Sequence, residues 1–241
     1  MTSDAQATPP RSGKTAVISG AAGGIGRALA EGFLAAGYGV TGIDRAAPAW
    51  TAPGFTAAIL DIRDTTAVAA FGATLDRLDV LVNAAGIIRR GAEFELPVFE
   101  EVVDINLTGT MRLSTACRPA LAKAGGSIVN IASMLSFFGG RLVPGYSAAK
   151  GGIVTLTKSL AIAWAGDNIR VNAIAPGWIA TPMTDALRDD EARSRAILER
   201  TPMGRWGRPE DLVGPALFLA SPAAGFVTGT VLPVDGGYAA M

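Results

Sequence analysis

The stretch Lys14-Thr-Ala-Val-Ile-Ser-Gly20-Ala-Ala-Gly-Gly24-Ile-Gly26 decides the fold that this sequence predicts. It opens with a run of β-branched and apolar residues, which is typical of a buried strand. Glycines at G-x-x-x-G-x-G spacing follow, and residues 27–37 then carry apolar side chains at helical spacing and end at a glycine. Glycines permit a tight turn and let the backbone approach a pyrophosphate at a helix N-terminus. Strand, glycine turn and helix in this order therefore predict a dinucleotide-binding unit.

An acidic residue, Asp44, ends the next predicted strand, residues 39–44. A carboxylate at this point of a βαβ unit accepts hydrogen bonds from ribose hydroxyls and repels a 2′-phosphate, which favours NAD over NADP. Arg45 follows at once and is able to bind that phosphate, so NADP stays the less favoured alternative. Without a cofactor role, Asp44 would be a helix N-cap or a solvated loop acid.

Strand and helix patterns alternate through the rest of the chain. Further strands are predicted at 55–60, 78–82, 127–133, 169–175 and 230–235, and helices at 97–122, 146–165, 184–200 and 210–220. This alternation predicts an α/β fold, a single-domain, Rossmann-type, doubly wound parallel sheet with helices on both faces. We expect the domain to span residues 14–241 and to follow a disordered tail at residues 1–13, which are polar and contain proline.

Polar or turn-forming residues close several of these strands. They are Asp44, Asp61, Asn83, Ser133 and Pro176-Gly177. The carboxyl ends of parallel strands meet at one edge of the sheet, where ligands of doubly wound folds bind. The sequence therefore predicts that these residues gather around one site.

Composition narrows the range of functions. Lys and Arg together number 21, as do Asp and Glu, and this balance argues against nucleic acid or an anionic membrane as a partner. No apolar run reaches the ~18 residues that span a bilayer. The one cysteine, Cys117, permits no internal disulfide, so a reducing cytoplasm is expected. Because histidine is absent, Ser-His-Asp triads and His-based zinc sites are excluded, no metal is expected, and any acid/base group must be Tyr, Lys, Asp or Glu.

Tyr146 and Lys150 are the acid/base candidates in a recognisable arrangement. Four residues apart, they lie on one face of a predicted helix whose start is marked by Pro144-Gly145. A helix N-terminus and an adjacent ammonium both favour a phenolate. Together with a cationic cofactor, they are expected to lower the pKa of Tyr146 from its usual value of ~10. A solvated surface pair is the alternative interpretation of an isolated Y-x-x-x-K.

Together these motifs resemble the short-chain dehydrogenase/reductase family. The resemblance covers residues 14–241 and includes Asn83-Ala-Ala-Gly86 and Asn106 besides the segments above. It departs at Ser19, where threonine is usual, and at Ala84, where asparagine is common. The resemblance implies a catalytic set, Asn106, Ser133, Tyr146 and Lys150, and a cofactor-binding set, Gly20, Gly24, Ile25, Gly26, Asp44, Asp61, Ile62, Asn83, Ala84, Gly86, Tyr146, Lys150, Pro176, Gly177, Ile179 and Thr181.

The resemblance also implies roles. Tyr146 would be the general base in alcohol oxidation and the general acid in ketone reduction. Lys150 would lower the pKa of Tyr146 and bind the nicotinamide ribose, and Ser133 would bind the substrate oxygen. Asn106 would anchor a water in a proton relay to Lys150.

Three further expectations follow from the same resemblance. Thr181 would hold the nicotinamide carboxamide, and residues 184–200 would form a mobile substrate lid. The enzyme would be a homotetramer, in which the helix after Lys150 carries small residues that allow helices of two subunits to approach, namely Gly151, Gly152, Ala161 and Ala163. Packing within one subunit explains the same small residues equally.

A narrower resemblance concerns the substrate. Residues 87–90, 131–137 and 202–207 are similar to those of the 2-dehydro-3-deoxy-D-gluconate 5-dehydrogenases, also called 2-deoxy-D-gluconate 3-dehydrogenases, which are NAD-linked enzymes of sugar acids. This implies a small-molecule substrate with a carboxylate, which a guanidinium binds through two parallel hydrogen bonds. The candidate substrate residues are Arg89, Arg90 and Arg141. The alternative interpretation is that these arginines are solvated or make subunit contacts.

Rival functions stay open. The 3-oxoacyl-acyl-carrier-protein reductases are similar in length and motifs, but they generally prefer NADPH and need a basic docking patch, so Asp44 and the neutral net charge argue against them. Another polyol or sugar dehydrogenase is a closer competitor. A catalytically silent, nucleotide-sensing binding protein would not need all four catalytic residues.

Overall fold

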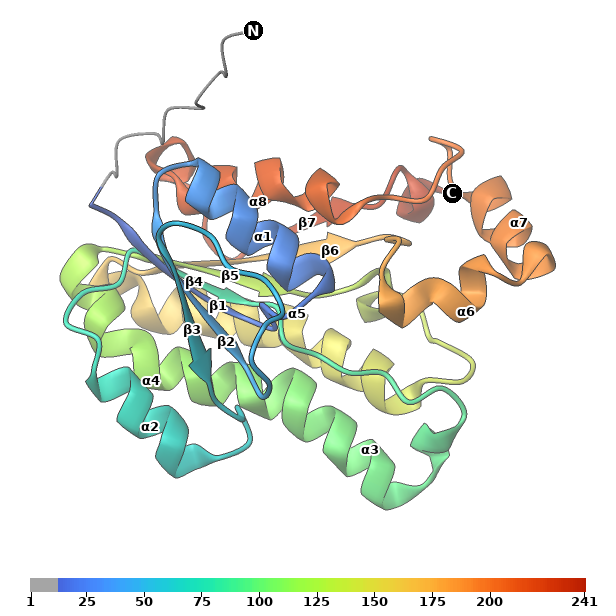
Figure 1. The fold of residues 1–241 in the computed structure, drawn as a ribbon. Coiled ribbons are helices and arrows are strands. Elements are labelled where there is room, and N and C mark those ends of the chain that lie inside the picture. The colour runs from blue at the N-terminus through green and yellow to red at the C-terminus, as the bar shows by residue number, and fades with distance from the viewer. Residues whose placement is uncertain (1–12) are drawn as a thin grey trace, which may run out of the picture.

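Seven parallel strands form the centre of the structure, a computed structural model that describes residues 13–241 (Figure 1). The strands are β1 (Thr15–Ser19), β2 (Gly39–Asp44), β3 (Phe55–Ile59), β4 (Val80–Asn83), β5 (Ser127–Ile131), β6 (Arg170–Pro176) and β7 (Val231–Val234). Their spatial order is β3-β2-β1-β4-β5-β6-β7. The tail predicted at residues 1–13 lies outside the described residues except for Gly13.

Helices cover both faces of this sheet. They are α1 (Gly24–Ala35), α2 (Thr65–Ala73), α3 (Leu96–Val103), α4 (Gly109–Ala124), α5 (Pro144–Trp164), α6 (Asp185–Arg188), α7 (Glu191–Arg200) and α8 (Val213–Ala220). In Figure 1, α1 and α8 lie on one face, while α2, α4 and α5 lie on the other. The doubly wound α/β fold predicted from the sequence is therefore confirmed.

The apolar residues of the strands hold the three layers together. Successive side chains of a strand point to opposite faces of a sheet. Val17 accordingly packs in the cluster that contains Leu113 of α4, and Ile18 packs in the cluster that contains Phe33 of α1. All four side chains are at most 1% exposed, and each contributes roughly 1.5–3 kcal/mol to folding relative to an exposed position. Burial on both faces explains why the strands are continuous apolar runs.

The strand order reverses at β1, which pairs with β2 on one side and with β4 on the other. The chain leaves β1 through Gly20, whose φ of +73° is in the left-handed region. The first turn of α1 packs directly on this bend, because a Cβ on Gly26 would overlap the carbonyl group of Gly20. Crevices of doubly wound folds open at such a reversal, beyond the carboxyl ends of the strands.

Two helical segments differ in detail from the sequence prediction. The helix predicted at 97–122 is divided into α3 and α4 by a π-helical turn, Asp104–Thr108. Periodicity does not reveal such a turn, because its wider ring shifts the helical pattern over a single turn only. The helix predicted at 184–200 is divided into α6 and α7. No helix within residues 13–241 has the length and apolar character that crossing a membrane would require.

Candidate active site

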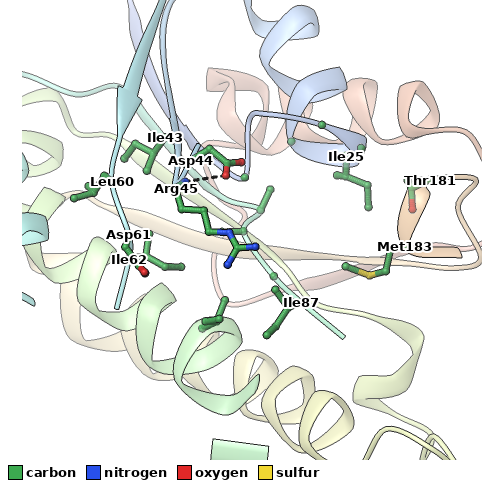
Figure 2. Close-up of a pocket in the computed structure, with 18 of the residues that line it drawn as sticks. Ile25, Ile43, Asp44, Arg45, Leu60, Asp61, Ile62, Ile87, Thr181 and Met183 are labelled. Carbon is green, nitrogen blue, oxygen red and sulfur yellow. Dashed lines mark hydrogen bonds between the residues drawn. The ribbon is translucent and has the colours of Figure 1, made fainter. Parts of the chain in front are cut away.

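A cavity of about 380 Å³ opens at the carboxyl end of β1, beside the first turn of α1 (Figure 2). The predicted cofactor residues that line it are Gly20, Gly24, Ile25, Gly26, Asp44, Asp61, Ile62, Ala84, Gly86 and Thr181. Those that do not line it are Asn83, Tyr146, Lys150, Pro176, Gly177 and Ile179. Half of the residues that line this cavity are therefore among those that the family resemblance implied.

The first turn of α1 is suited to an anion. Its N-cap, Gly23, has no side chain to accept a hydrogen bond, and no acidic residue lies in the first turn. The N–H groups of a first helical turn have no partner within the helix, and the helix dipole favours negative charge there. Gly24, the first residue of the helix, has a φ of +53°, and a Cβ there would be in ordinary contact with Cγ2 of Thr181 at 3.7 Å. These features fit the pyrophosphate of a dinucleotide.

Asp44 stands at the end of β2, next to the glycine turn. Its Oδ2 accepts a hydrogen bond from the N–H of Ala22 at 3.1 Å, and its Oδ1 accepts one from the N–H of Arg45 at 2.8 Å. Figure 2 shows the Arg45 side chain extending over the cavity. Asp44 and Arg45 therefore both line the part of the cavity that lies next to the end of β2.

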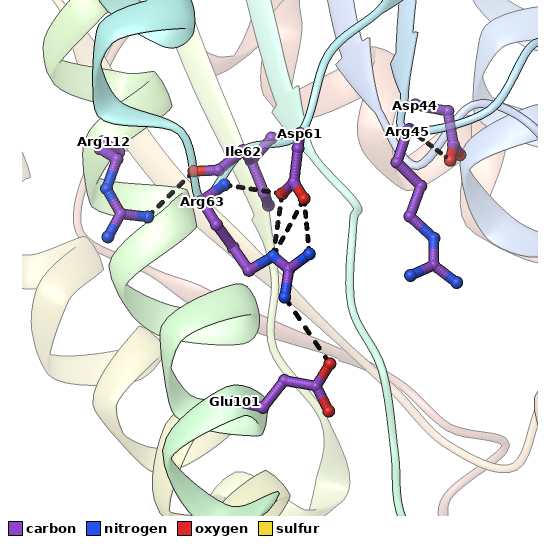
Figure 3. Close-up of polar contacts among 7 residues, drawn as sticks. All are labelled: Asp44, Arg45, Asp61, Ile62, Arg63, Glu101 and Arg112. Atoms are coloured by element: carbon purple, nitrogen blue, oxygen red, sulfur yellow. Dashed lines mark hydrogen bonds and ion pairs between the residues drawn. The ribbon is translucent and has the colours of Figure 1, made fainter. Parts of the chain in front are cut away.

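Asp61, at the end of β3, is held by a neighbouring arginine. Both of its carboxylate oxygens accept hydrogen bonds from Arg63, the shortest at 2.6 Å, and the opposite side of that guanidinium lies 3.8 Å from Glu101 of α3 (Figure 3). The hydrogen bonds from Arg63 lower the pKa of Asp61. Ile62 is fixed by its carbonyl oxygen, which accepts a hydrogen bond from Arg112 at 2.9 Å.

Asn83 lies at the end of β4 as predicted, but its side chain turns into the interior. It is 3% exposed, and its Nδ2 donates to Ser114 Oγ at 3.0 Å and to Asn130 Oδ1 at 2.8 Å. Nδ2 of Asn130 in turn donates to Thr157 of α5 at 3.0 Å. The side chain therefore joins β4 to β5 and α5 and makes no part of the cavity wall.

The segment that follows β6, residues 177–181, packs against neighbouring elements and leads to the cavity. A Cβ on Gly177 would come within 2.6 Å of the Asp235 backbone, so this turn passes close to the end of β7. Ile179 is 5% exposed and packs in the cluster of α1 and α8. These contacts place Thr181 at the cavity.

Tyr146, Ser133 and Lys150 come together at the start of α5. The pKa of Tyr146 is affected by a hydrogen bond with the Ser133 hydroxyl, and Nζ of Lys150 lies 5.6 Å from the centre of the tyrosine ring. Lys150 is 5% exposed, and its Nζ donates to the carbonyl oxygen of Ile131 at 2.6 Å. The ammonium is thus fixed between the end of β5 and the tyrosine.

Asn106 completes this group from the π-helical turn. It is fully buried, and its Nδ2 donates to the carbonyl oxygens of Ile87 at 2.9 Å and Val102 at 2.8 Å. Its Oδ1 has no hydrogen-bond partner. A Cβ on Gly86 would lie 2.5 Å from that Oδ1 and 3.8 Å from Nζ of Lys150. Buried amide oxygens normally have a partner, so Oδ1 is an acceptor available beside the lysine.

The pKa of Tyr146 in the structure differs from the sequence prediction. Burial raises the pKa of Tyr146, although the hydrogen bond with Ser133 and the positive charge of Arg90 lower it. The prediction that the pKa of Tyr146 is lowered is therefore wrong for the chain alone. One reason is that the helix N-terminus is already occupied by the carboxylate of Glu93, which also raises that pKa. Burial lowers the pKa of Lys150 to about 8.

The structure separates the three predicted substrate arginines. Arg90 is half-buried and interacts electrostatically with Tyr146, and burial lowers its pKa. Arg89 points elsewhere, since its Nε lies 3.7 Å from Glu101. Arg141 is exposed. Arg90 is thus the one of these three arginines whose charge affects the pKa of the tyrosine.

Sequence reasoning missed Glu93. It lies in a 3₁₀ turn, Ala92–Phe94, is 1% exposed, and accepts a hydrogen bond from the N–H of Tyr146 at 2.8 Å. A single glutamate in a loop carries no pattern that would have distinguished it. Within residues 13–241, no group of three or more acidic, histidine or cysteine side chains is placed to hold a metal ion.

Comparison with known proteins agrees with this geometry. A profile of the family described as Enoyl-(Acyl carrier protein) reductase matches residues 20–239. The 2-dehydro-3-deoxy-D-gluconate 5-dehydrogenase of Dickeya dadantii (strain 3937) is 43% identical over 95% of this chain and 96% of its own length. The chain belongs to the short-chain dehydrogenase/reductase family.

Other members of this family are similar over comparable lengths. The 2-dehydro-3-deoxy-D-gluconate 5-dehydrogenase of Escherichia coli (strain K12) is also 43% identical, over 95% of this chain and 96% of its own. A gluconate 5-dehydrogenase from Burkholderia cenocepacia, solved in complex with NADP and tartrate, has a TM-score of 0.91 at 35% identity and covers 96% of this chain and 97% of its own. The short-chain dehydrogenase/reductase fold therefore extends over the whole described domain.

The buried ammonium of Lys150 has a measurable effect on stability. Its folded-state pKa of about 8 lies below the ~10.4 of an unfolded lysine, so between these values the unfolded chain binds more protons and stability increases with pH. From pH 7.5 to 10.5, the unfolding free energy of the wild type should rise relative to that of Lys150→Met by on the order of 3 kcal/mol. Urea unfolding at each pH measures this, and Lys158→Met, which replaces an exposed lysine of the same helix, is the control. A constant difference would contradict the low pKa.

Proposed function

We propose that this protein is an NAD-dependent oxidoreductase that interconverts a secondary alcohol and a ketone on a sugar acid of the 2-dehydro-3-deoxy-D-gluconate type. The observation that supports this best is Arg90, a half-buried guanidinium whose positive charge lowers the pKa of Tyr146, which is itself hydrogen-bonded with Ser133. It puts a carboxylate-binding group next to an acid/base group. The relatives named as 2-dehydro-3-deoxy-D-gluconate 5-dehydrogenases support the same substrate class.

In alcohol oxidation, Tyr146 accepts the hydroxyl proton of the substrate, and in ketone reduction it donates that proton. The Ser133 hydroxyl donates a hydrogen bond to the substrate oxygen and stabilises the negative charge that develops there. A bound nicotinamide supplies the hydride acceptor or donor. The glycine turn, Asp44 and Thr181 are the residues that would hold the dinucleotide.

The proton leaves Tyr146 toward the buried side of the site. Lys150 lies against the tyrosine ring, and the unpaired Oδ1 of Asn106 is close to its ammonium. A water that Oδ1 holds would accept a hydrogen bond from Lys150 and so continue the proton relay, as the family resemblance implies. Because the pKa of Lys150 is about 8, this lysine is able to release and regain a proton near neutral pH.

The choice of NAD rests on Asp44. Its carboxylate is anchored by two backbone N–H groups at the cavity, where it would repel a 2′-phosphate. Arg45 lies beside it and would attract one, and the related Burkholderia enzyme was solved with NADP. We therefore propose a preference for NAD with measurable activity on NADP.

We also propose that the enzyme acts in the cytoplasm as a homotetramer. Two of the small residues named for the interface pack within the subunit, since a Cβ on Gly152 would meet Leu107 and Ala161 is 4% exposed. Ile162 on the same helix is 81% exposed, but a single exposed apolar side chain does not indicate an interface. The support for the tetramer is therefore the family resemblance.

The function itself is tested with a panel of substrates. The purified protein should oxidise or reduce sugar acids of the 2-dehydro-3-deoxy-D-gluconate type with NAD(H), followed by NADH absorbance, in preference to simple polyols and an acetoacetyl thioester. Tyr146→Phe should lose at least ~10³-fold in kcat and still bind NADH, because it lacks only the transferable proton. Preference for the thioester with NADPH would instead indicate an acyl-carrier-protein reductase.

The cofactor preference is tested by Asp44→Ala. Removing the carboxylate should shift the ratio of kcat/KM for NAD to that for NADP at least tenfold toward NADP, which corresponds to ~1.4 kcal/mol. Initial rates with both nucleotides measure this ratio. Asp76→Ala, at an exposed acid away from the cavity, should keep the wild-type ratio. An unchanged ratio in Asp44→Ala would assign the preference to other residues.

The role of Arg90 is tested by its effect on substrates with and without a carboxylate. Arg90→Ala should raise KM for the sugar acid at least tenfold, because a buried bidentate contact is lost, while KM for an uncharged sugar alcohol changes less than about threefold. Arg141→Ala, which replaces an exposed arginine, is the control. Equal changes of KM for both kinds of substrate would show that Arg90 does not bind the carboxylate.

A further inference from the structure

Glu93 is a buried acid that neither the cavity nor the proton path accounts for. Its side chain is 1% exposed, although it lies in a short surface turn whose neighbours Ala92 and Phe94 are exposed. Removing a carboxylate from water is costly unless hydrogen bonds replace the lost hydration. The hydrogen bonds of Glu93 therefore show which segments its buried carboxylate connects.

Each oxygen of Glu93 accepts one backbone hydrogen bond. Oε1 accepts from the N–H of Arg89 at 2.8 Å, and Oε2 accepts from the N–H of Tyr146, also at 2.8 Å. The first contact closes the turn that carries Arg89 and Arg90, and the second reaches 53 residues along the chain to the start of α5. One side chain thus connects the arginine turn to the tyrosine.

The start of α5 needs such a partner. An N-cap side chain usually accepts a hydrogen bond from the second or third residue of its helix, but the N-cap here is Val143, which has no acceptor. The N–H of Tyr146 would be left without a partner. Glu93 supplies the missing acceptor from another segment, and Gly145 leaves room for it, since a Cβ there would lie 3.3 Å from Oε2.

A second contact holds the same two segments together. The N–H of Gly91 donates to the carbonyl oxygen of Leu142 at 2.8 Å. The arginine turn is therefore attached on both sides of Arg90, to the loop before α5 and to α5 itself. The charged groups that face Arg90 are Tyr146, Glu93 and, from α7, Arg193.

We propose that Glu93 is a positioning residue of the active site, whose carboxylate fastens the Arg89–Arg90 turn to the first turn of α5 and so fixes Arg90 at its place beside Tyr146. This rests on the proposed function, in which Arg90 binds the substrate carboxylate. Glu93 does not touch the reacting atoms, and besides its small effect on the pKa of Tyr146 it acts through Arg90. Its effect is accordingly on the recognition of charged substrates.

The test is a double-mutant cycle of Glu93→Gln and Arg90→Ala in the full-length enzyme. A glutamine amide accepts only at its oxygen, so Glu93→Gln loses one of the two hydrogen bonds. KM for the sugar acid should rise at least tenfold, and KM for an uncharged sugar alcohol less than about threefold. In the Arg90→Ala background, Glu93→Gln should raise KM for the sugar acid less than about twofold further, because coupled residues are not additive.

Controls separate this role from general damage. Glu95→Gln removes the same charge from an exposed position of the same segment and should behave as the wild type. Glu93→Asp keeps the charge on a shorter side chain and should raise KM for the sugar acid with kcat retained. If Glu93→Gln does not fold, as thermal unfolding will show, Glu93→Asp decides.

The outcomes distinguish the two proposals. A wild type that turns over no sugar acid overturns the proposed function. The role of Glu93 is overturned, and the proposed function is not, if the wild type turns over the sugar acid and the Glu93 variants have its KM values. The same conclusion follows if the effect of Glu93→Gln adds fully to that of Arg90→Ala. A selective, non-additive rise of KM supports it.

Discussion

The close approach of α1 to the end of β1 is the contact on which the rest of the site depends. A Cβ on Gly26 would overlap the carbonyl group of Gly20, so only glycine lets the first turn of the helix lie on the bend. A Cβ on Gly20 would in turn meet the backbone of Ala84 and Ala85 at 2.9 Å. The ends of β1 and β4 and the start of α1 therefore converge within a few ångströms. Ser19 secures the junction, since its hydroxyl accepts hydrogen bonds from both alanine N–H groups at 3.1 Å.

A buried polar network connects the strands at the cavity to α5, the helix that carries Tyr146 and Lys150. Asn83, Asn130 and Thr157 connect β4, β5 and α5, and each side chain is at most 3% exposed. Polar groups at this depth need partners in definite directions, so the network specifies how α5 lies on the sheet. That placement lets Lys150 reach the carbonyl oxygen of Ile131 at the end of β5. The cofactor edge and the acid/base residues are thus set by one scaffold.

The sequence predicted those parts of the site that depend on local patterns. The glycine turn, Asp44 at the end of β2 and a helix start near Tyr146 all follow from residue types at fixed spacing. The structure has the first two where expected and begins α5 two residues earlier than predicted, at Pro144. The inward turn of Asn83 was not predictable, because it depends on partners from two other elements. The same holds for Glu93. Its partner lies 53 residues away, and that contact is one reason why the expected lowering of the pKa of Tyr146 is absent.

The cost of burying charge explains why the pKa of Tyr146 is raised in the chain alone. In the chain alone, the raised pKa of Tyr146 keeps the phenol protonated, and Lys150 with a pKa of about 8 is close to losing its proton at neutral pH. The raised pKa of Tyr146 and the lowered pKa of Lys150 both favour the neutral form of the side chain. Neutral forms are favoured because burying a charge away from water is costly. A phenolate at Tyr146 therefore requires positive charge nearby, and Arg90 and Lys150 are the groups that the chain provides. Arg90 therefore acts on the acidity of the tyrosine, and under the proposed function the same guanidinium would bind the substrate carboxylate.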